Sequence, residues 1–295
     1  MLVSVRSAAA HVPSALPSTK VVMLPSVSEL LVLADVPDVD ARRICVALLP
    51  GDGMREELAR RLAIDIVVRL TEPVPEAFDR WYAHFCGGPG LSDVDKAELL
   101  AYVGADFKNF KDVTRLEGAV VEHLWASVAD ALEGGWGRPM RVEHEHFSVI
   151  DHGPDGLSIY EIDGANLGFR LWESKRHAGA GAVTKTITTA ARQLRDNGPE
   201  YLARISKVLQ TSPDNRVAAL GGQLVRAWKE DWGTSSVGVS VGRSPGGSPP
   251  SRPFVGLRRH FKFDDPRRRE GVIIEIPDLA GFATQVGLLV LTGTS

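Results

Sequence analysis

The chain has 295 residues, of which 44% are hydrophobic and 24% are charged, and its formal net charge is −3. This composition is typical of a globular protein, and the length is sufficient for one large domain or two modest ones. The slightly negative charge excludes an overall basic field. Any binding of nucleic acid must therefore depend on a local patch of positive side chains.

Two cysteines, Cys45 and Cys86, are present, and neither lies in a CxxC motif. This excludes a disulfide framework and a structural zinc site, and it fits a reducing cytoplasm. The first twenty residues contain no unbroken apolar segment of the kind found in signal peptides. The apolar run at residues 286–291 is too short to span a bilayer. We therefore expect a cytoplasmic protein with no membrane partner.

Strands and helices alternate in the first ninety residues. Apolar runs predict strands at 43–49 and 64–70, and helical patterns predict helices at 54–62 and 76–85. No cluster of residues there indicates chemistry. The sequence Gly-Gly-Pro-Gly at 87–90 predicts a domain boundary, which divides the chain into an α/β region at 1–90 and a larger domain at 91–295.

The larger domain also alternates between the two patterns. Predicted strands lie at 141–146, 147–150, 155–160, 169–175, 235–241 and 271–276; predicted helices lie at 94–103, 115–132, 183–196, 199–209, 216–232 and 278–286. The helix at 115–132 has the strongest amphipathic pattern. The fold class we expect is α/β, with a mixed central sheet flanked by helices and a smaller N-terminal α/β region.

Three charged residues converge in the predicted strands around residue 170. Side chains alternate across a strand, so Glu173 and Lys175 share one face. If the strand at 155–160 pairs with the strand at 169–175, Asp155 lies beside Glu173. Two carboxylates and an ammonium group at one edge of a sheet suit a site for Mg²⁺, which prefers oxygen ligands.

The motif formed by Pro154-Asp155 and, eighteen positions after the aspartate, Glu173-Ser174-Lys175 resembles that of the PD-(D/E)xK nuclease superfamily, which has the restriction-endonuclease-like fold. The resemblance covers roughly the second half of the chain. It implies a Mg²⁺-dependent endonuclease, with Mn²⁺ as a possible substitute, that hydrolyses phosphodiester bonds, most readily those of DNA. Asp155, Glu173 and the backbone carbonyl of Ser174 would hold the metal, and Lys175 would assist catalysis.

Members of this superfamily often contribute a further acidic residue from a helix before the sheet. Glu122 in the predicted helix 115–132 is our first candidate for this catalytic role, and Glu117 is the second. The alternative is that each is an ordinary solvated glutamate beside an apolar stripe.

A narrower resemblance rests on four segments. The helix RLEGAVVEHLW, a D-x-G-x-D-G turn, the acid-x-Lys strand and the late strand GVIIEI are similar to those of the nuclease subunit of the Hachiman phage-defence system. That subunit works with a helicase. The resemblance implies a role in antiviral defence and a helicase subunit as partner.

Nucleic-acid contacts are expected from two regions. Lys185, Arg192 and Gln193 lie in the helix predicted directly after the acid-x-Lys strand, and Arg258 and Arg259 belong to the densest positive stretch of the chain. Ordinary solvated charge is the competing interpretation for both regions.

Three other hypotheses remain open. The chain could be a nuclease-fold protein that binds nucleic acid or a partner without cutting. It could be another metal hydrolase that uses His144, His146, Asp151 and His152. The charged residues could also form a surface ion-pair cluster with no activity.

Overall fold

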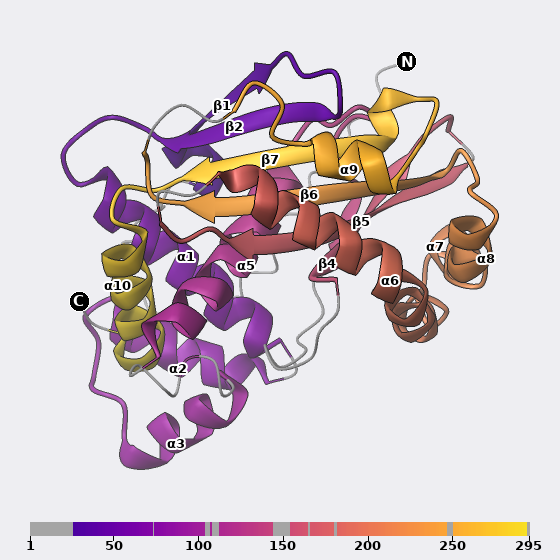
Figure 1. Ribbon diagram of the computed structural model, residues 1–295. Coiled ribbons are helices and arrows are strands. Elements are labelled where there is room, and N and C mark those ends of the chain that lie inside the picture. Colours follow the sequence, from indigo (N-terminus) through magenta and orange to yellow (C-terminus); the bar gives the residue numbers. More distant parts are fainter. Residues whose placement is uncertain are drawn as a thin grey trace, which may run out of the picture.

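A computed structural model describes residues 26–72, 74–103, 107, 112–143, 154–164, 166–179, 182–246 and 250–293. In these residues the chain forms a mixed seven-stranded sheet with helices on both faces (Figure 1). The strands are β1 (Leu31–Val36), β2 (Arg42–Leu48), β3 (Arg141–Glu143), β4 (Gly156–Glu161), β5 (Leu167–Arg176), β6 (Ser235–Arg243) and β7 (Arg269–Glu275). The expected fold class is confirmed.

The strand order is β1-β2-β7-β6-β5-β4-β3. The four central strands, β2, β7, β6 and β5, run parallel to one another, whereas β1 pairs antiparallel with β2, β4 with β5, and β3 with β4. Because β2 pairs with β7, strands from both sides of the predicted boundary at 87–90 lie in one sheet. The division of the chain into domains at 1–90 and 91–295 stays a prediction.

Two helical layers bury the sheet. One face is covered by α6 (Val183–Leu209), α7 (Asn215–Gly221), α8 (Leu224–Lys229) and α9 (Val255–His260). The other is covered by α1 (Met54–Leu70), α5 (Val113–Ala131) and α10 (Leu279–Thr292), onto which α2 (Pro75–Phe85) and α3 (Asp93–Tyr102) pack (Figure 1). Two short 3₁₀ helices, η1 (Val27–Leu30) and η2 (Pro266–Arg268), complete the described elements.

The predicted strand at 64–70 is wrong, because these residues form the second half of α1. Their branched apolar side chains favour a strand locally, but Leu58, Leu62 and Ile66 are fully buried at helical spacing. Burial of this one helix face against the sheet outweighs the local preference of the run IDIVV for extended backbone.

Two further boundaries differ from prediction. The helices predicted at 183–196 and 199–209 are one helix, α6, with Pro199 inside it. A proline in a helix interior costs about 3 kcal/mol, and the buried face that continues through Leu194, Gly198 and Leu202 offsets this cost. The helix predicted at 216–232 is divided into α7 and α8 on either side of 222–223.

Small residues on β6 allow large side chains to cross over it. A Cβ atom on Gly238 would lie 2.2 Å from Cε3 of Trp172, so only glycine leaves room for this indole. Trp172 in turn packs against Trp125 of α5, with ring centroids 5.6 Å apart. The contact fixes α5 against the middle of the sheet.

A buried ion pair lies on the same face. Arg170 of β5 and Glu270 of β7 are both fully buried, and their side chains approach to 3.1 Å across the small residues of β6. Arg170 also donates to the Tyr160 hydroxyl at 3.1 Å and to the carbonyl of Arg267 at 2.8 Å. The pair links two strands that do not hydrogen bond with each other.

Removal of one charge from this pair is expected to destabilise the fold strongly. Glu270→Gln leaves the Arg170 guanidinium buried without its counter-charge, which typically costs about 3–5 kcal/mol. Urea unfolding followed by circular dichroism measures the change. The matched control is Glu200→Gln, which removes one partner of the exposed Arg204–Glu200 pair and should change stability little. Equal effects of the two substitutions would contradict this view of the buried pair.

Candidate active site at the β4–β5 edge

Antiparallel pairing of β4 with β5 places Asp155 beside the acid-x-Lys segment. The backbone N–H of Asp155 donates to the carbonyl of Trp172 at 2.9 Å, which extends the ladder by one residue beyond the strand. The Asp155 carboxylate Oδ2 then accepts a hydrogen bond from the backbone N–H of Ser174 at 2.5 Å. The sequence prediction that Asp155 meets this strand thus agrees with the structure.

The three charged residues share one face of the sheet. Leu157 and Leu171 lie in the core under α6, and the two-residue period of a strand puts Asp155, Glu173 and Lys175 on that same face. Glu173 Oε1 and Lys175 Nζ are 2.5 Å apart.

Burial differs sharply among the three. The Glu173 side chain is 1% exposed, whereas the Lys175 side chain is 30% exposed and Asp155 is half-buried. Both carboxylate oxygens of Glu173 are buried; Oε1 faces the Lys175 ammonium, and Oε2 accepts no hydrogen bond from the described residues. The cluster is thus open to solvent at Asp155 and Lys175 and closed behind Glu173.

The electrostatic environment raises all three pKa values. Burial raises the pKa of Asp155 to about 6, against the opposing effects of Lys175 and the Ser174 N–H. Burial, reinforced by the Asp155 charge, raises the pKa of Glu173 well above its ordinary value. Burial alone would lower the pKa of Lys175, but the negative charges of Asp155, Glu173 and Glu122 outweigh it and raise that pKa. Lys175 therefore remains a cation at neutral pH.

These features fit a divalent cation. Two carboxylates face a single ammonium group, and buried carboxylate charge that one ammonium does not balance is energetically costly unless a further cation approaches it. The N–H and carbonyl of one strand residue point to the same side, so the Ser174 carbonyl faces the edge where Asp155 lies. Two carboxylates, a carbonyl and waters match the ligands Mg²⁺ takes. Among the described residues, no three His, Cys, Asp or Glu side chains form a metal-binding group.

The structure separates the two candidate helix glutamates. Glu117 is buried and forms an ion pair with Arg176 at 2.8 Å, so its carboxylate is engaged away from Asp155. Glu122 is half-buried and contributes to the raised pKa of Lys175, more weakly than Asp155 and Glu173 do. Of the two, Glu122 remains the candidate for the site.

The residues predicted to contact nucleic acid have mixed surroundings. Lys185 and Arg192 are exposed on α6, as are Arg258 and Arg259 on α9. Gln193 is half-buried, and its Oε1 is buried without a hydrogen-bond partner. Their contacts with nucleic acid stay predictions. The alternative metal cluster of His144, His146, Asp151 and His152 lies outside the described residues.

A cavity of about 640 Å³ begins where β5 ends. Arg176 and His177, the two residues that follow Lys175, line it together with Arg243 of β6 and the first residues of α6 and α10. His177 Nδ1 lies 2.8 Å from the Thr186 hydroxyl of α6. Cavities at the carboxyl ends of parallel strands are common ligand sites in α/β sheets, and this one adjoins the acid-x-Lys segment.

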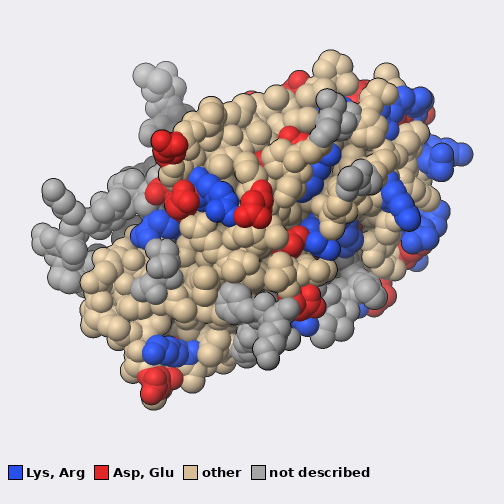
Figure 2. Space-filling view, turned by 60° about the vertical axis from the view of Figure 1, so that its left-hand side comes forward, with Lys and Arg blue, Asp and Glu red and all other residues tan. Residues whose placement is uncertain are grey.

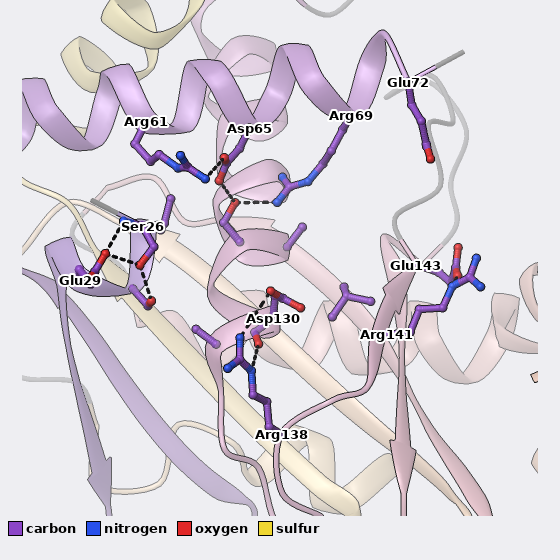
Figure 3. A pocket seen from close by; sticks show the side chains of 16 residues that line it. Ser26, Glu29, Arg61, Asp65, Arg69, Glu72, Asp130, Arg138, Arg141 and Glu143 are labelled. Carbon is purple, nitrogen blue, oxygen red and sulfur yellow. Dashed lines mark hydrogen bonds and ion pairs between the residues drawn. The ribbon is translucent and has the colours of Figure 1, made fainter. Parts of the chain in front are cut away.

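A larger cavity of about 910 Å³ lies between α1, α5 and β3 (Figure 3). Its charges largely satisfy one another. Asp65 bonds Arg61 at 3.1 Å, and the Ser127 hydroxyl joins Asp65 to Arg69 at 3.1 and 2.7 Å. Figure 3 also shows Arg138 beside Asp130, whose backbone carbonyl accepts a hydrogen bond from Arg138 Nε at 3.0 Å. The polar lining is thus explained by internal pairing.

Sequence reasoning missed how the arginine-rich segment 267–269 is used. Arg268 and Arg269 are buried, and Arg268 bonds to the Ser235 carbonyl and pairs with Asp231. Arg267 pairs with Asp265 at 2.9 Å. The carboxylate partner of Arg268 lies 37 residues earlier in the chain, so no local signal distinguished this arginine from a solvated one.

Comparisons with known proteins add no identification. No protein-family model matches this sequence, and no curated protein matches it significantly. None of the described helices combines the length and apolar character needed to cross a bilayer.

The raised carboxyl pKa values predict a pH-dependent effect of Asp155→Asn. Between about pH 4 and pH 6 the folded protein retains a proton on Asp155 that the unfolded chain releases, so ionisation of this group lowers wild-type stability as pH rises through that window. Asp155→Asn has no carboxyl group to ionise at this position, so its stability does not fall in this way. Its stability relative to wild type should therefore be more favourable at pH 8 than at pH 4.

The measurement is urea unfolding of both proteins in EDTA across this pH range. Asp196→Asn, which alters an exposed carboxylate on α6, is the control, and its difference from wild type should vary much less with pH. A pH-independent difference between wild type and Asp155→Asn would contradict the burial of Asp155.

Proposed function

We propose that this protein is a Mg²⁺-dependent endonuclease that hydrolyses phosphodiester bonds of DNA. The observation that supports the proposal most strongly is the cluster of Asp155, Glu173 and Lys175 on one sheet face, in which two carboxylates, one of them buried, share a single ammonium group. Its resemblance to the PD-(D/E)xK motif, noted from the sequence, gives the same assignment.

Asp155, Glu173 and the Ser174 carbonyl would hold the metal. When bound, Mg²⁺ supplies a water of lowered pKa and neutralises negative charge on the phosphate oxygens. The Ser174 N–H already fixes the orientation of the Asp155 carboxylate. The buried Glu173 carboxylate is held rigidly by the strand, so the two ligands are organised before any substrate arrives.

Lys175 acts as a hydrogen-bond donor in this proposal. Its raised pKa keeps the amine protonated at neutral pH, so it cannot serve as a general base there. A protonated lysine 2.5 Å from Glu173 can orient a water beside the scissile phosphate or stabilise the charge that develops on that phosphate. The negative charge of Glu122 on α5 would help to keep the Lys175 ammonium in position.

The distribution of charge over the wider surface bears on how the protein would bind a nucleic acid. Figure 2 shows positive and negative side chains interspersed over much of one face of the molecule, rather than one continuous basic surface. Selective binding of a polyanion must therefore use defined positions, for which Lys185, Arg192, Gln193, Arg258 and Arg259 are our candidates.

The biological setting is also a proposal. The similarity of four sequence segments to the Hachiman nuclease subunit supports a role in antiviral defence, with a helicase subunit as partner. Cys45 and Cys86 form no disulfide, which fits activity in a reducing cytoplasm.

Replacement of Lys175 is expected to abolish cleavage without loss of the fold. Lys175→Ala should lower the Mg²⁺-dependent nicking rate of supercoiled plasmid by at least about 100-fold, the usual effect of removing one charge-stabilising donor. The control is Lys207→Ala, an exposed lysine near the end of α6, which should cleave like wild type. Unchanged cleavage by Lys175→Ala would overturn the catalytic assignment.

Metal binding can be tested without activity. At a Mg²⁺ concentration about 100 times its Kd, the metal should stabilise the wild-type fold by about 2.7 kcal/mol. Asp155→Asn should lose this stabilisation, whereas Lys175→Ala should keep it because both carboxylates remain. Thermal unfolding with and without Mg²⁺ measures the effect. Stabilisation of Asp155→Asn equal to that of wild type would show that the metal binds elsewhere.

A further inference from the structure

A second charged site lies on the same side of the sheet, and here positive charge is in excess. A pocket of about 460 Å³ is formed where the segment around α9 meets β7 and the turn between β1 and β2. We call it the basic pocket. Its lining includes five cationic side chains and two carboxylates: Arg252, Arg258, Arg259, Lys262 and Arg269, with Asp40 and Asp264.

The floor of the basic pocket is rigidly built. Arg269 is 4% exposed, and its guanidinium donates to the backbone carbonyls of Asp40 at 2.7 Å and Phe263 at 2.6 Å. The Asp40 carboxylate is fully buried and accepts two hydrogen bonds from Arg252, at 2.9 and 2.7 Å. This bidentate contact holds Arg252 at the pocket wall.

The cations outnumber the anion that faces them. Arg258 lies 3.6 Å from the same Asp40 carboxylate that Arg252 occupies, so one carboxylate serves two guanidinium groups. Arg252 and Arg258 hold the pKa of Asp40 below its ordinary value, and burial together with the charge of Arg258 lowers the pKa of Arg269. Arg259 and Lys262 are exposed at the rim and add further positive charge. An anion entering the pocket would relieve this repulsion.

The basic pocket and the catalytic cluster lie on the same face of the sheet, and α6 and α9 pack on the core between them. Arg269 shares a face with Gly271 and Ile273 of β7, and parallel pairing aligns Ile273 with Val241 and Lys175. From Lys175 to Arg269 is four residues along the strands and two strand spacings across. These are roughly 13 Å and 10 Å, a diagonal of about 16 Å.

α6 and α9 lie side by side over the sheet between the two sites. A nucleic acid that contacts both sites must therefore pass over the outer surface of these helices, where the exposed Arg192 and Arg259 can pair with its phosphates.

We propose that the basic pocket binds a backbone phosphate of the nucleic acid substrate, away from the bond that is cut. This inference rests on the proposed nuclease function for the identity of the substrate, but the pocket's affinity for a phosphodiester is independent of it. The pocket anchors the substrate through Arg258, Arg259 and Lys262, while Asp40, Arg252 and Arg269 form its fixed floor.

The test measures binding of the full-length protein to a fluorescein-labelled DNA duplex of about 20 base pairs by anisotropy, in EDTA, between about 50 and 200 mM salt. The variant is Arg259→Ser with Lys262→Ser, which alters exposed rim residues and leaves the buried floor intact. Its log–log salt slope should fall by about 2 relative to wild type, because each phosphate contact contributes about one unit.

Two controls make the result specific to the pocket. Lys207→Ser with Lys229→Ser removes the same charge from exposed sites on α6 and α8 and should leave the slope unchanged. The exchange Arg259→Lys with Lys262→Arg keeps the charge in place and should bind like wild type. Equal slopes for the rim variant and the Lys207/Lys229 control would overturn the proposal.

Other outcomes separate this proposal from the nuclease function. If plasmid nicking is absent in wild type but the rim variant still loses duplex binding, the nuclease function fails and the phosphate site stands. If the rim variant binds duplex normally but loses thermal stabilisation by millimolar inorganic phosphate, the pocket holds a small phosphate compound and the nucleic-acid anchor is refuted.

Discussion

The buried pair of Arg170 and Glu270 sets the geometry on which both charged sites depend. It crosses β6, which carries small residues at this level, and so fixes β5 and β7 relative to each other although they share no hydrogen bonds. Arg42 of β2 also approaches Glu270, at 3.5 Å, which extends the link to the strand contributed by the first ninety residues. A buried charge tolerates little displacement from its partner. The register that results places Glu173 and Lys175 on β5 and Arg269 on β7, all on the opposite face.

The two sites on that opposite face have complementary charge. The cluster of Asp155, Glu173 and Lys175 has more carboxylates than cations, which the proposed Mg²⁺ would balance, whereas the basic pocket has more cations than carboxylates, which the proposed phosphate would balance. A nucleic acid with bound Mg²⁺ supplies both. This arrangement also explains why a chain with a net charge of −3 can be proposed as a nuclease. The positive charge that matters is a few positioned guanidinium groups, and a count of the whole chain does not reveal it.

The sequence predicted the fold class, most of the strands and the convergence of Asp155 with Glu173 and Lys175, because each rests on local signals: alternation, turn residues and a short motif. Prediction from the sequence failed where tertiary packing determined the local structure. Residues 64–70 favour a strand by composition, yet burial makes them helical. The edge strand β1 has mostly exposed side chains and gave no alternating pattern to detect. The basic pocket was hidden because Asp40 and Arg252 are 212 residues apart in the chain. Such pairs become visible only in the folded structure.

The burial of Glu173 is the strongest argument against the view that these charges form a simple surface ion-pair cluster. In such a cluster both partners are solvated, and water satisfies the oxygens that the pair leaves over. Here the carboxylate is 1% exposed, Lys175 reaches its Oε1, and its buried Oε2 accepts no hydrogen bond from the described residues, while a second carboxylate beside it raises its pKa further. A structural role does not require this arrangement, since a neutral side chain of similar size would be more stable in the same place. The cost is offset when a cation binds, and the group therefore fits a metal ligand better than a structural ion pair.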